Sequence, residues 1–115
     1  MKQRYTLKKN SEFRRLYSRG KSAVTPYLVV YCRPNKGGEN RLGDTVSAKL
    51  GHAVVRNRIR RQLREIVRLN RGRLRQGYDL VVVARSRCVR GDWHRMEAAF
   101  LQACGKLQLL KEGEA

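Results

Sequence analysis

Hydrophobic residues in this chain follow two spacings, one typical of helices and one typical of strands. The i, i+3, i+4 spacing of Phe13, Leu16 and Tyr17 predicts a short first helix. Asn10 supplies a side-chain oxygen that can cap its start, and Gly20 marks its end. The first structured element should therefore be an amphipathic helix with an aromatic stripe.

Strand patterns occupy three segments. Residues 27–32 are β-branched and aromatic and alternate between two faces, which predicts a strand. After the turn-rich segment 34–40, residues 41–49 alternate again and predict a second strand, antiparallel to the first. The continuous apolar run 79–84 is typical of a strand that is buried on both faces.

Two further helices follow from a period of about 3.6 residues. Between residues 54 and 69, one apolar stripe is formed by Val55, Ile59, Leu63 and Ile66. Asp92 can cap a last helix, whose predicted core residues are Met96, Ala99, Phe100, Ala103 and Leu107. The order helix, strands, helix, strand, helix predicts an α/β (α+β) sandwich, in which helices cover a mixed sheet of about four strands.

The length of 115 residues fits a single domain over 1–115, with residues 1–9 and 110–115 expected to be flexible. Charge then changes the picture, because 27 Lys and Arg oppose nine Asp and Glu, for a net charge of +18. Such a charge implies a polyanionic partner. No apolar run is long enough to span a membrane, and the first ten residues lack a signal-peptide core. The three separated cysteines fit reduced, packed side chains, so we expect a cytoplasmic protein.

The basic residues concentrate on the central helix. Helical placement puts most of them opposite the apolar stripe, with Arg56 and Arg58 on the two borders. Guanidinium groups can bond phosphates bidentately and stack on unpaired bases, which favours RNA. A membrane-surface helix is also basic and amphipathic, but this stripe is narrow, lacks Trp and Phe, and is needed to cover the sheet. The predicted RNA-binding residues are Arg56, Asn57, Arg58, Arg60, Arg61, Arg64 and Arg68.

Residues 53–65, AVVRNRIRRQLRE, closely resemble the "RNR" signature of the bacterial ribonuclease P protein subunit. Residues 41–43, 46–51 and 78–85 strengthen the resemblance, which extends from Tyr5 to Leu107. It implies the fold of the second domain of ribosomal protein S5, with a left-handed β-α-β crossover around the signature helix. Ordinary chirality rules would have excluded that hand.

The resemblance also implies a function. A catalytic RNA subunit, with Mg²⁺ bound mainly by that RNA and the substrate, would remove the 5′ leader of precursor tRNA. The signature helix would face the RNA subunit, and no obligate protein partner or membrane is expected. A cleft between the first helix and the sheet would receive the leader through Phe13, Tyr17 and Tyr31, with Lys49 beside them, and Arg85 and Tyr27 as further candidates. Aromatic faces suit this task because they accept any unpaired base.

Two positions depart from the family pattern, and other functions stay open. Ala48 replaces a usual basic residue, so that Arg41 could supply the missing phosphate contact, and Tyr17 replaces a common phenylalanine. We expect no catalytic or metal-binding residue in the protein, because its carboxylates and histidines do not cluster. The alternative is a structural RNA-binding protein of ribosomal type. A DNA-binding module would need a helix placed for the major groove, and nothing indicates paired half-sites.

Overall fold

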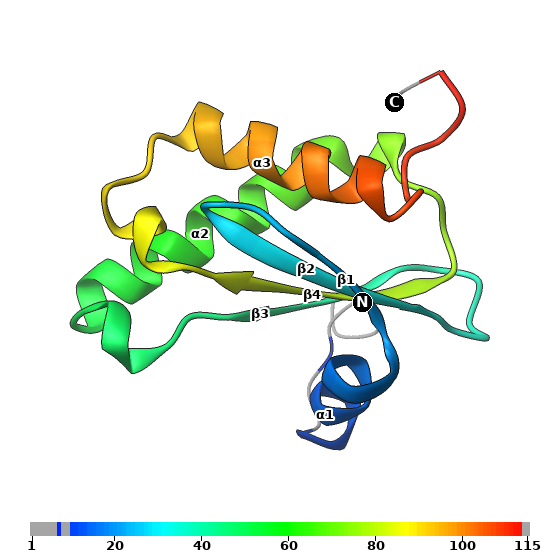
Figure 1. The fold of residues 1–115 in the computed structure, drawn as a ribbon, viewed down its shortest axis with the longest axis horizontal. Coiled ribbons are helices and arrows are strands. Elements are labelled where there is room, and N and C mark those ends of the chain that lie inside the picture. The colour runs from blue at the N-terminus through cyan, green and yellow to red at the C-terminus, as the bar shows by residue number, and fades with distance from the viewer. Residues whose placement is uncertain (1–6, 8–9, 114–115) are drawn as a thin grey trace.

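The computed structural model describes residue 7 and residues 10–113, in three layers around one sheet (Figure 1). The helices and strands are α1 (Asn10–Arg19), β1 (Lys21–Val24), β2 (Leu28–Pro34), β3 (Arg41–Thr45), α2 (Ala53–Asn70), β4 (Tyr78–Ala84) and α3 (Trp93–Lys106). Three short 3₁₀ helices are η2 (Ala48–Leu50), η3 (Arg71–Arg73) and η4 (Ser86–Arg90). Helix α1 lies on one side of the sheet, and α2 and α3 cover the other. The predicted class, a mixed four-stranded sheet covered by helices, is confirmed.

The strand order is β1-β2-β4-β3, in which β3 pairs with β4 in parallel and the other pairs are antiparallel. Strand β3 runs antiparallel to β2, as predicted, but β4 lies between them. Because β3 and β4 are parallel neighbours, the chain must cross over between them, and α2 is that crossover. The helix that carries the arginines is therefore fixed against the sheet at both of its ends.

Alternation along the strands sends side chains into two cores. On the α2 and α3 side, the larger core contains Leu28 and Val30 of β2, Leu80 and Val82 of β4, and Phe100 of α3. On the α1 side, Leu7, Leu16 and Val81 form a smaller core with Phe13, Tyr31 and Val83 packed against it. The prediction that β4 is buried on both faces is thus confirmed.

The structure corrects two strand predictions. Strand β1 was not predicted, because only Ala23 of its four residues is buried and the segment shows no alternation of apolar and polar residues. The second strand ends at Thr45 rather than at Lys49, since the hydroxyl of Ser47 accepts a hydrogen bond from the Lys49 amide and starts η2. An apparent alternation in sequence was therefore a capped turn of 3₁₀ helix.

The predicted helices are confirmed with small changes in their bounds. Ile59, Leu63 and Ile66 of α2 are buried, and Asp92 caps α3 by accepting from the His94 amide at 3.3 Å. Buried Asn70 was missed. Its amide donates to the Ile66 carbonyl and to Glu97 of α3, at 2.8 Å each, and so joins the two helices.

Residues near both chain ends contact the rest of the fold. Leu7 is buried, and its amide donates to the Leu42 carbonyl at 3.0 Å. Leu110 is buried in a bridge with Leu74, and the Lys111 amide donates to Arg73 at 2.8 Å. The flexibility of residues 1–9 and 110–115 stays a prediction, and residues 1–6, 8–9 and 114–115 lie outside the described part of the chain.

All three cysteines are reduced and buried, as predicted. Burial raises the pKa of the Cys104 thiol to about 12, with a smaller contribution from the neighbouring Cys32. A search of the described residues for a helix of sufficient length and hydropathy to cross a bilayer finds none.

Gly20 permits the tight turn from α1 into β1. A Cβ there would stand 2.6 Å from the Leu16 carbonyl oxygen and 2.8 Å from that of Cys32. Both are backbone atoms, so Gly20→Ala should lower the free energy of unfolding by about 1–3 kcal/mol. Gly105→Ala is the matched control, because that site in α3 has room for a methyl group. This substitution should raise the free energy of unfolding by about 0.5–1 kcal/mol. Urea unfolding of both variants checks the opposite signs, and a stable Gly20→Ala protein would contradict this account of the turn.

Candidate RNA interfaces

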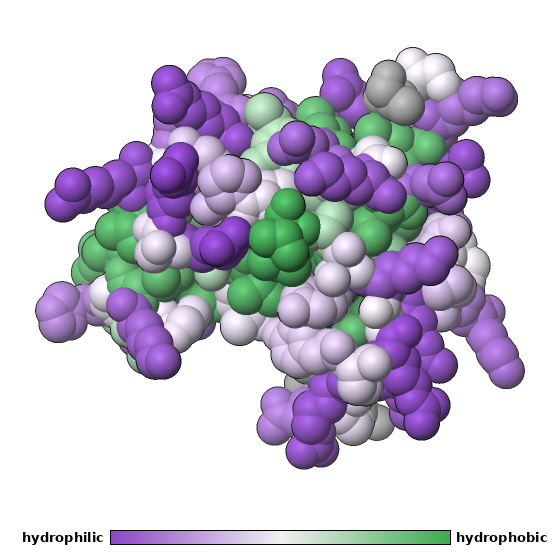
Figure 2. Space-filling model, in the orientation of Figure 1, coloured by the Kyte–Doolittle hydropathy of each residue, from purple (hydrophilic) through white to green (hydrophobic). Residues whose placement is uncertain are grey.

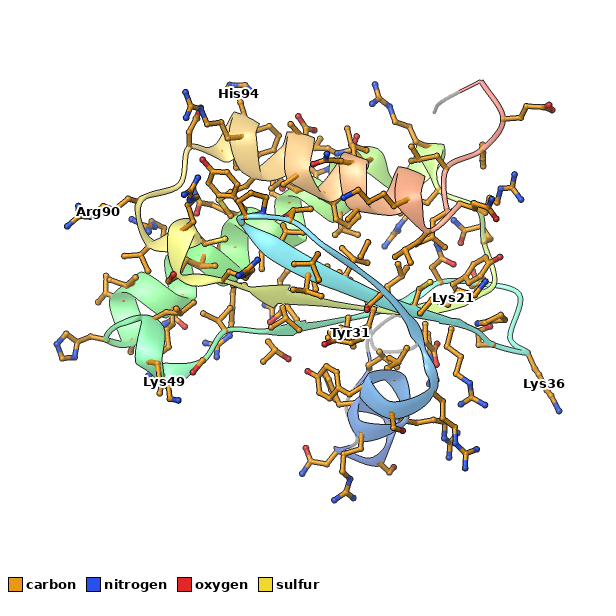
Figure 3. The ribbon with its side chains drawn as sticks, viewed as in Figure 1. Lys21, Tyr31, Lys36, Lys49, Arg90 and His94 are labelled. Atoms are coloured by element: carbon orange, nitrogen blue, oxygen red, sulfur yellow. The ribbon has the colours of Figure 1, made fainter. Side chains whose placement is uncertain are left out.

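An aromatic cluster lies where α1 meets the sheet. The rings of Tyr17 and Tyr31 pack edge to face, with centroids 5.0 Å apart. The hydroxyl of Tyr17 hydrogen-bonds that of Thr45 at 2.9 Å, while the residue keeps 41% of its surface exposed. In Figure 3, Tyr31 projects from β2 toward α1. The structure thus brings together two predicted leader-binding residues and leaves an aromatic surface open to solvent.

Phe13 sits deeper in the same cluster. A Cβ on Gly43 would lie 2.7 Å from its ring, so the ring packs directly on the backbone of β3. Glycine is therefore needed at this position for close approach rather than for an unusual φ. Phe13 thus supports the aromatic surface from the side of the sheet, and it also lines a hollow next to that surface.

That hollow connects the aromatic cluster with α2. It has a volume of about 460 Å³ and is lined by Asn10, Phe13, Arg14, Tyr17, Asp44, Thr45, Val46 and Arg60. Arg60 belongs to the arginine-bearing helix, while Tyr17 belongs to α1. The two predicted RNA-binding surfaces are consequently neighbours, with Asp44 of β3 between them.

Lys49 and Arg85, two further predicted leader-binding residues, lie outside the hollow beside the aromatic cluster. Lys49 lies on η2 near the start of α2, well apart from Tyr31 in Figure 3. It is therefore not beside the aromatic residues as the sequence suggested. Arg85 follows β4 and donates to the Thr25 carbonyl at 2.8 Å, on the rim of a second hollow of about 510 Å³. Tyr27 packs against the large core, with Arg87 over its ring at 5.9 Å.

The arginines of α2 divide into exposed and braced groups. Arg56 donates to the Gly51 carbonyl at 3.1 Å. Arg58 donates to Val89 at 2.5 Å and more weakly to Cys88 at 3.5 Å, which ties α2 to η4. These two side chains support the helix, so their contribution to RNA contact would be indirect.

Asn57, Arg61, Arg64 and Arg68 are exposed, while Arg60 is half-buried. Arg64 and Arg60 share Asp44, at 3.0 Å and 3.7 Å, and Arg60 also donates to Asn57 at 3.2 Å. Arg61 is exposed and has no ion pair within the described residues. The basic face therefore keeps a large excess of positive charge over Asp44.

At the far end of this face, Arg68 pairs with Glu65 at 2.6 Å. The hydrogen bond from Arg68 holds the pKa of the Glu65 carboxyl below its usual range. Arg68 is thereby partly neutralised, which fits its prediction as the weaker end of the arginine surface. Figure 2 shows hydrophilic side chains along the margins of one face, with hydrophobic atoms exposed near its centre and at the end where α2 begins.

Arg41 has a role that the sequence did not reveal. Its guanidinium donates to both carboxylate oxygens of Asp79, at 2.9 and 2.8 Å, and to Glu12 of α1 at 2.8 Å. These bonds raise its pKa above the usual value for arginine, with the Asp79 bond contributing most. Arg41 therefore ties α1 to the sheet, and its phosphate contact in place of Ala48 stays a prediction.

The carboxylates of the described residues are poorly placed for metal binding. Four of them have a carboxylate oxygen within 3.0 Å of an arginine nitrogen, namely Glu12, Asp44, Glu65 and Asp79. The described residues include no group of three or more His, Cys, Asp or Glu that could hold a metal ion. The donor set consequently does not fit a Mg²⁺ ion.

Comparison with known proteins identifies the family. Residues 1–108 match the model of the Ribonuclease P family. The "Ribonuclease P protein component" of Natranaerobius thermophilus is 42% identical over 97% of each chain. That of Caldanaerobacter subterraneus subsp. tengcongensis is 44% identical over 94% of this chain and 93% of its own.

Solved structures agree with the fold. A Staphylococcus aureus RNase P protein mutant, described as defective in mRNA degradation activity, superposes with a TM-score of 0.88 and 32% identity, over 96% of this chain and 93% of its own. The RNase P protein of Thermotoga maritima gives a TM-score of 0.78 and 34% identity, over 84% and 92%.

Removing the Arg41 charge should loosen α1. We expect Arg41→Gln to lower the free energy of unfolding by about 1–2 kcal/mol, since bonds between charged groups are worth roughly 1.5–3 kcal/mol before the partial exposure of this side chain is discounted. Glu12→Gln is the matched control, because it leaves the Arg41–Asp79 pair in place and should cost under about 1 kcal/mol. Urea unfolding measures both free energies. If the two variants lose equal stability, the Arg41–Asp79 pair does not contribute more than the Arg41–Glu12 pair, which contradicts this account.

Proposed function

The chain belongs to the ribonuclease P protein family, which serves in tRNA 5′-end processing, and from this premise we propose a division of labour between the arginine face of α2 and the aromatic cluster. Helix α2 binds the RNA subunit of the endoribonuclease. The aromatic cluster of α1 and β2 binds the single-stranded 5′ leader of precursor tRNA. Leader removal then follows with both RNAs held by one small domain.

The observation that carries the proposal for α2 is its one-sided charge. Arg60, Arg61 and Arg64 project from the face opposite the buried stripe, with Asp44 as the acidic neighbour. One carboxylate cannot neutralise three guanidinium groups, so the surplus is available to phosphates. Arg56 and Arg58 hold the helix at the correct angle through backbone carbonyls.

The aromatic cluster supports the leader-binding part of the proposal. Tyr17 is exposed, its hydroxyl is held by Thr45, and its ring is held by Tyr31. A ring fixed in this way can stack on an unpaired base with little loss of side-chain entropy. Stacking does not distinguish among bases, and leaders that differ in sequence could therefore all bind.

We assign the chemistry of cleavage to the RNA. Glu12, Asp44, Glu65 and Asp79 are bound by arginines, which supports a protein that supplies contacts and electrostatics rather than a general base or metal ligand. Mg²⁺ would be held by the RNA subunit and the substrate. Lys49 and Arg85 would guide RNA at the margins, since neither borders the hollow of the aromatic cluster. We place this function in the cytoplasm.

The family assignment decides against the alternative of a structural ribosomal-type protein, because the matched relatives are named as components of a processing enzyme. The partners in this proposal are the RNA subunit and precursor tRNA. It requires no second protein.

Salt dependence tests the role of α2. Arg61→Gln should weaken binding to a ribonuclease P RNA and reduce the slope of log K against log salt by about 0.7–0.9, because one phosphate contact is lost. Lys36→Gln is the matched control. It removes one positive charge from the turn between β2 and β3, at the opposite end of the molecule from Lys49 and the start of α2 (Figure 3). A filter-binding titration at several salt concentrations gives both slopes. If the two variants change the slope equally, only net charge matters and the docking role of α2 is rejected.

A further inference from the structure

A further hollow, different from those beside Tyr17 and Arg85, lies on the other flank of α2, between that helix and the start of α3. It has a volume of about 560 Å³, within the roughly 300–1,000 Å³ of sites that hold small molecules. Trp93, the only tryptophan of the chain, forms one wall. Arg58, Arg61 and Arg68 of α2 are among the residues that form the opposite wall.

The tryptophan is held but not enclosed. Trp93 packs partly against the large core and stays half-buried, and its ring meets that of His94 edge to face, with centroids 5.3 Å apart. Packing fixes the orientation of the indole while part of its surface remains open. An aromatic face held in this way is preorganised for stacking.

Two residues that line the hollow carry buried polar atoms that lack partners among the described residues. The side-chain oxygen of Gln62 and the Nε of Arg58 are both buried, and neither has a hydrogen-bond partner within the described residues. Unsatisfied buried polar atoms are costly, so two in one place indicate a ligand with hydrogen-bonding groups. One is an acceptor and the other a donor, which matches the mixed edge of a nucleobase.

We infer that this hollow receives one unpaired base of the RNA that α2 binds, stacked on Trp93 and covered by the guanidinium groups of Arg61 and Arg68. The inference rests on the proposed function of α2 and extends its RNA contact around the helix onto α3. Gln62 would meet the edge of the base after a small side-chain rotation, and Arg58 would offer its Nε while its bond to the Val89 carbonyl stays in place.

Charge explains why the occupant is a nucleotide. Four arginines line the hollow beside Trp93, and Glu65, which also lines it, is engaged by Arg68 at 2.6 Å. A nucleotide offers a flat ring for Trp93 and a phosphate for the arginines, whereas an apolar peptide would leave these cations desolvated and unpaired. The complementarity therefore favours RNA over a protein segment.

The intrinsic tryptophan fluorescence of the chain reports on Trp93 alone, because the sequence contains no other tryptophan. The full chain would be titrated with a ribonuclease P RNA from the source of a similar protein, and in parallel with heparin, a polyanion without bases. We expect the RNA to quench Trp93 emission and shield it from acrylamide, and heparin to bind without doing either. Equal quenching by heparin would overturn the stacking.

Affinity measurements complete the test. Trp93→Ala should weaken RNA binding by about 5- to 150-fold, the factor that corresponds to one stacked base, and Trp93→Phe should restore most of it. Gln102→Ala is the matched control, since this exposed residue of α3 does not line the hollow. Thermal melts identify a Trp93→Ala protein that fails to fold, in which case the emission of the unmodified chain decides.

The outcomes separate this inference from the function on which it rests. If RNA binds tightly but Trp93 emission and the affinity of the folded Trp93 variants stay unchanged, the base site is wrong and the role of α2 stands. If no ribonuclease P RNA binds the chain at all, both fail together.

Discussion

Strand β4 is hydrogen-bonded along both edges and packed on both faces, and the positions of both proposed RNA-binding surfaces follow from that constraint. Its residues alternate between the large core under α2 and α3 and the small core under α1. Burial of a central strand requires cover on both sides of the sheet. The parallel partner β3 requires a crossover, which is α2, while the opposite face is left to α1. The arginines of α2 and the aromatic residues Phe13 and Tyr17 of α1 are thereby placed on helices that lie on opposite sides of the sheet.

Ion pairs then fix the two surfaces relative to the sheet. Arg41 links Glu12 of α1 with Asp79 of β4, and Asp44 of β3 pairs with Arg60 and Arg64 of α2. Partly exposed pairs add little stability, but they orient long side chains. In a chain of net charge +18, these few carboxylates set the direction of guanidinium groups without neutralising the surface. The fold and the proposed RNA binding would draw on the same arginines, so that only part of α2 would be available to RNA.

Local patterns in the sequence predicted most of the fold. Helices α1, α2 and α3 and strands β2 and β4 show clear periodicity, and the signature string in α2 indicated the family. What failed depends on contacts between distant residues. Nothing local reveals the parallel pairing of β3 with β4, the capture of Arg58 by η4, or the use of Arg41 within the fold. Lys49, which the resemblance placed beside the aromatic residues, lies on a capped 3₁₀ turn that the alternating pattern of residues 41–49 did not reveal.

The central claim is that α2 and the aromatic cluster bind different RNAs, and leader length separates them most directly. The measurement is the affinity of the reconstituted enzyme for precursor tRNA with a long leader and for tRNA without one, using the wild type and a Tyr17→Ala, Tyr31→Ala variant. We predict that the variant binds the RNA subunit normally but loses the extra affinity that a leader confers, by roughly 1–3 kcal/mol per unstacked base. A variant that keeps the full leader advantage, or that loses affinity equally for both tRNAs, would contradict the account.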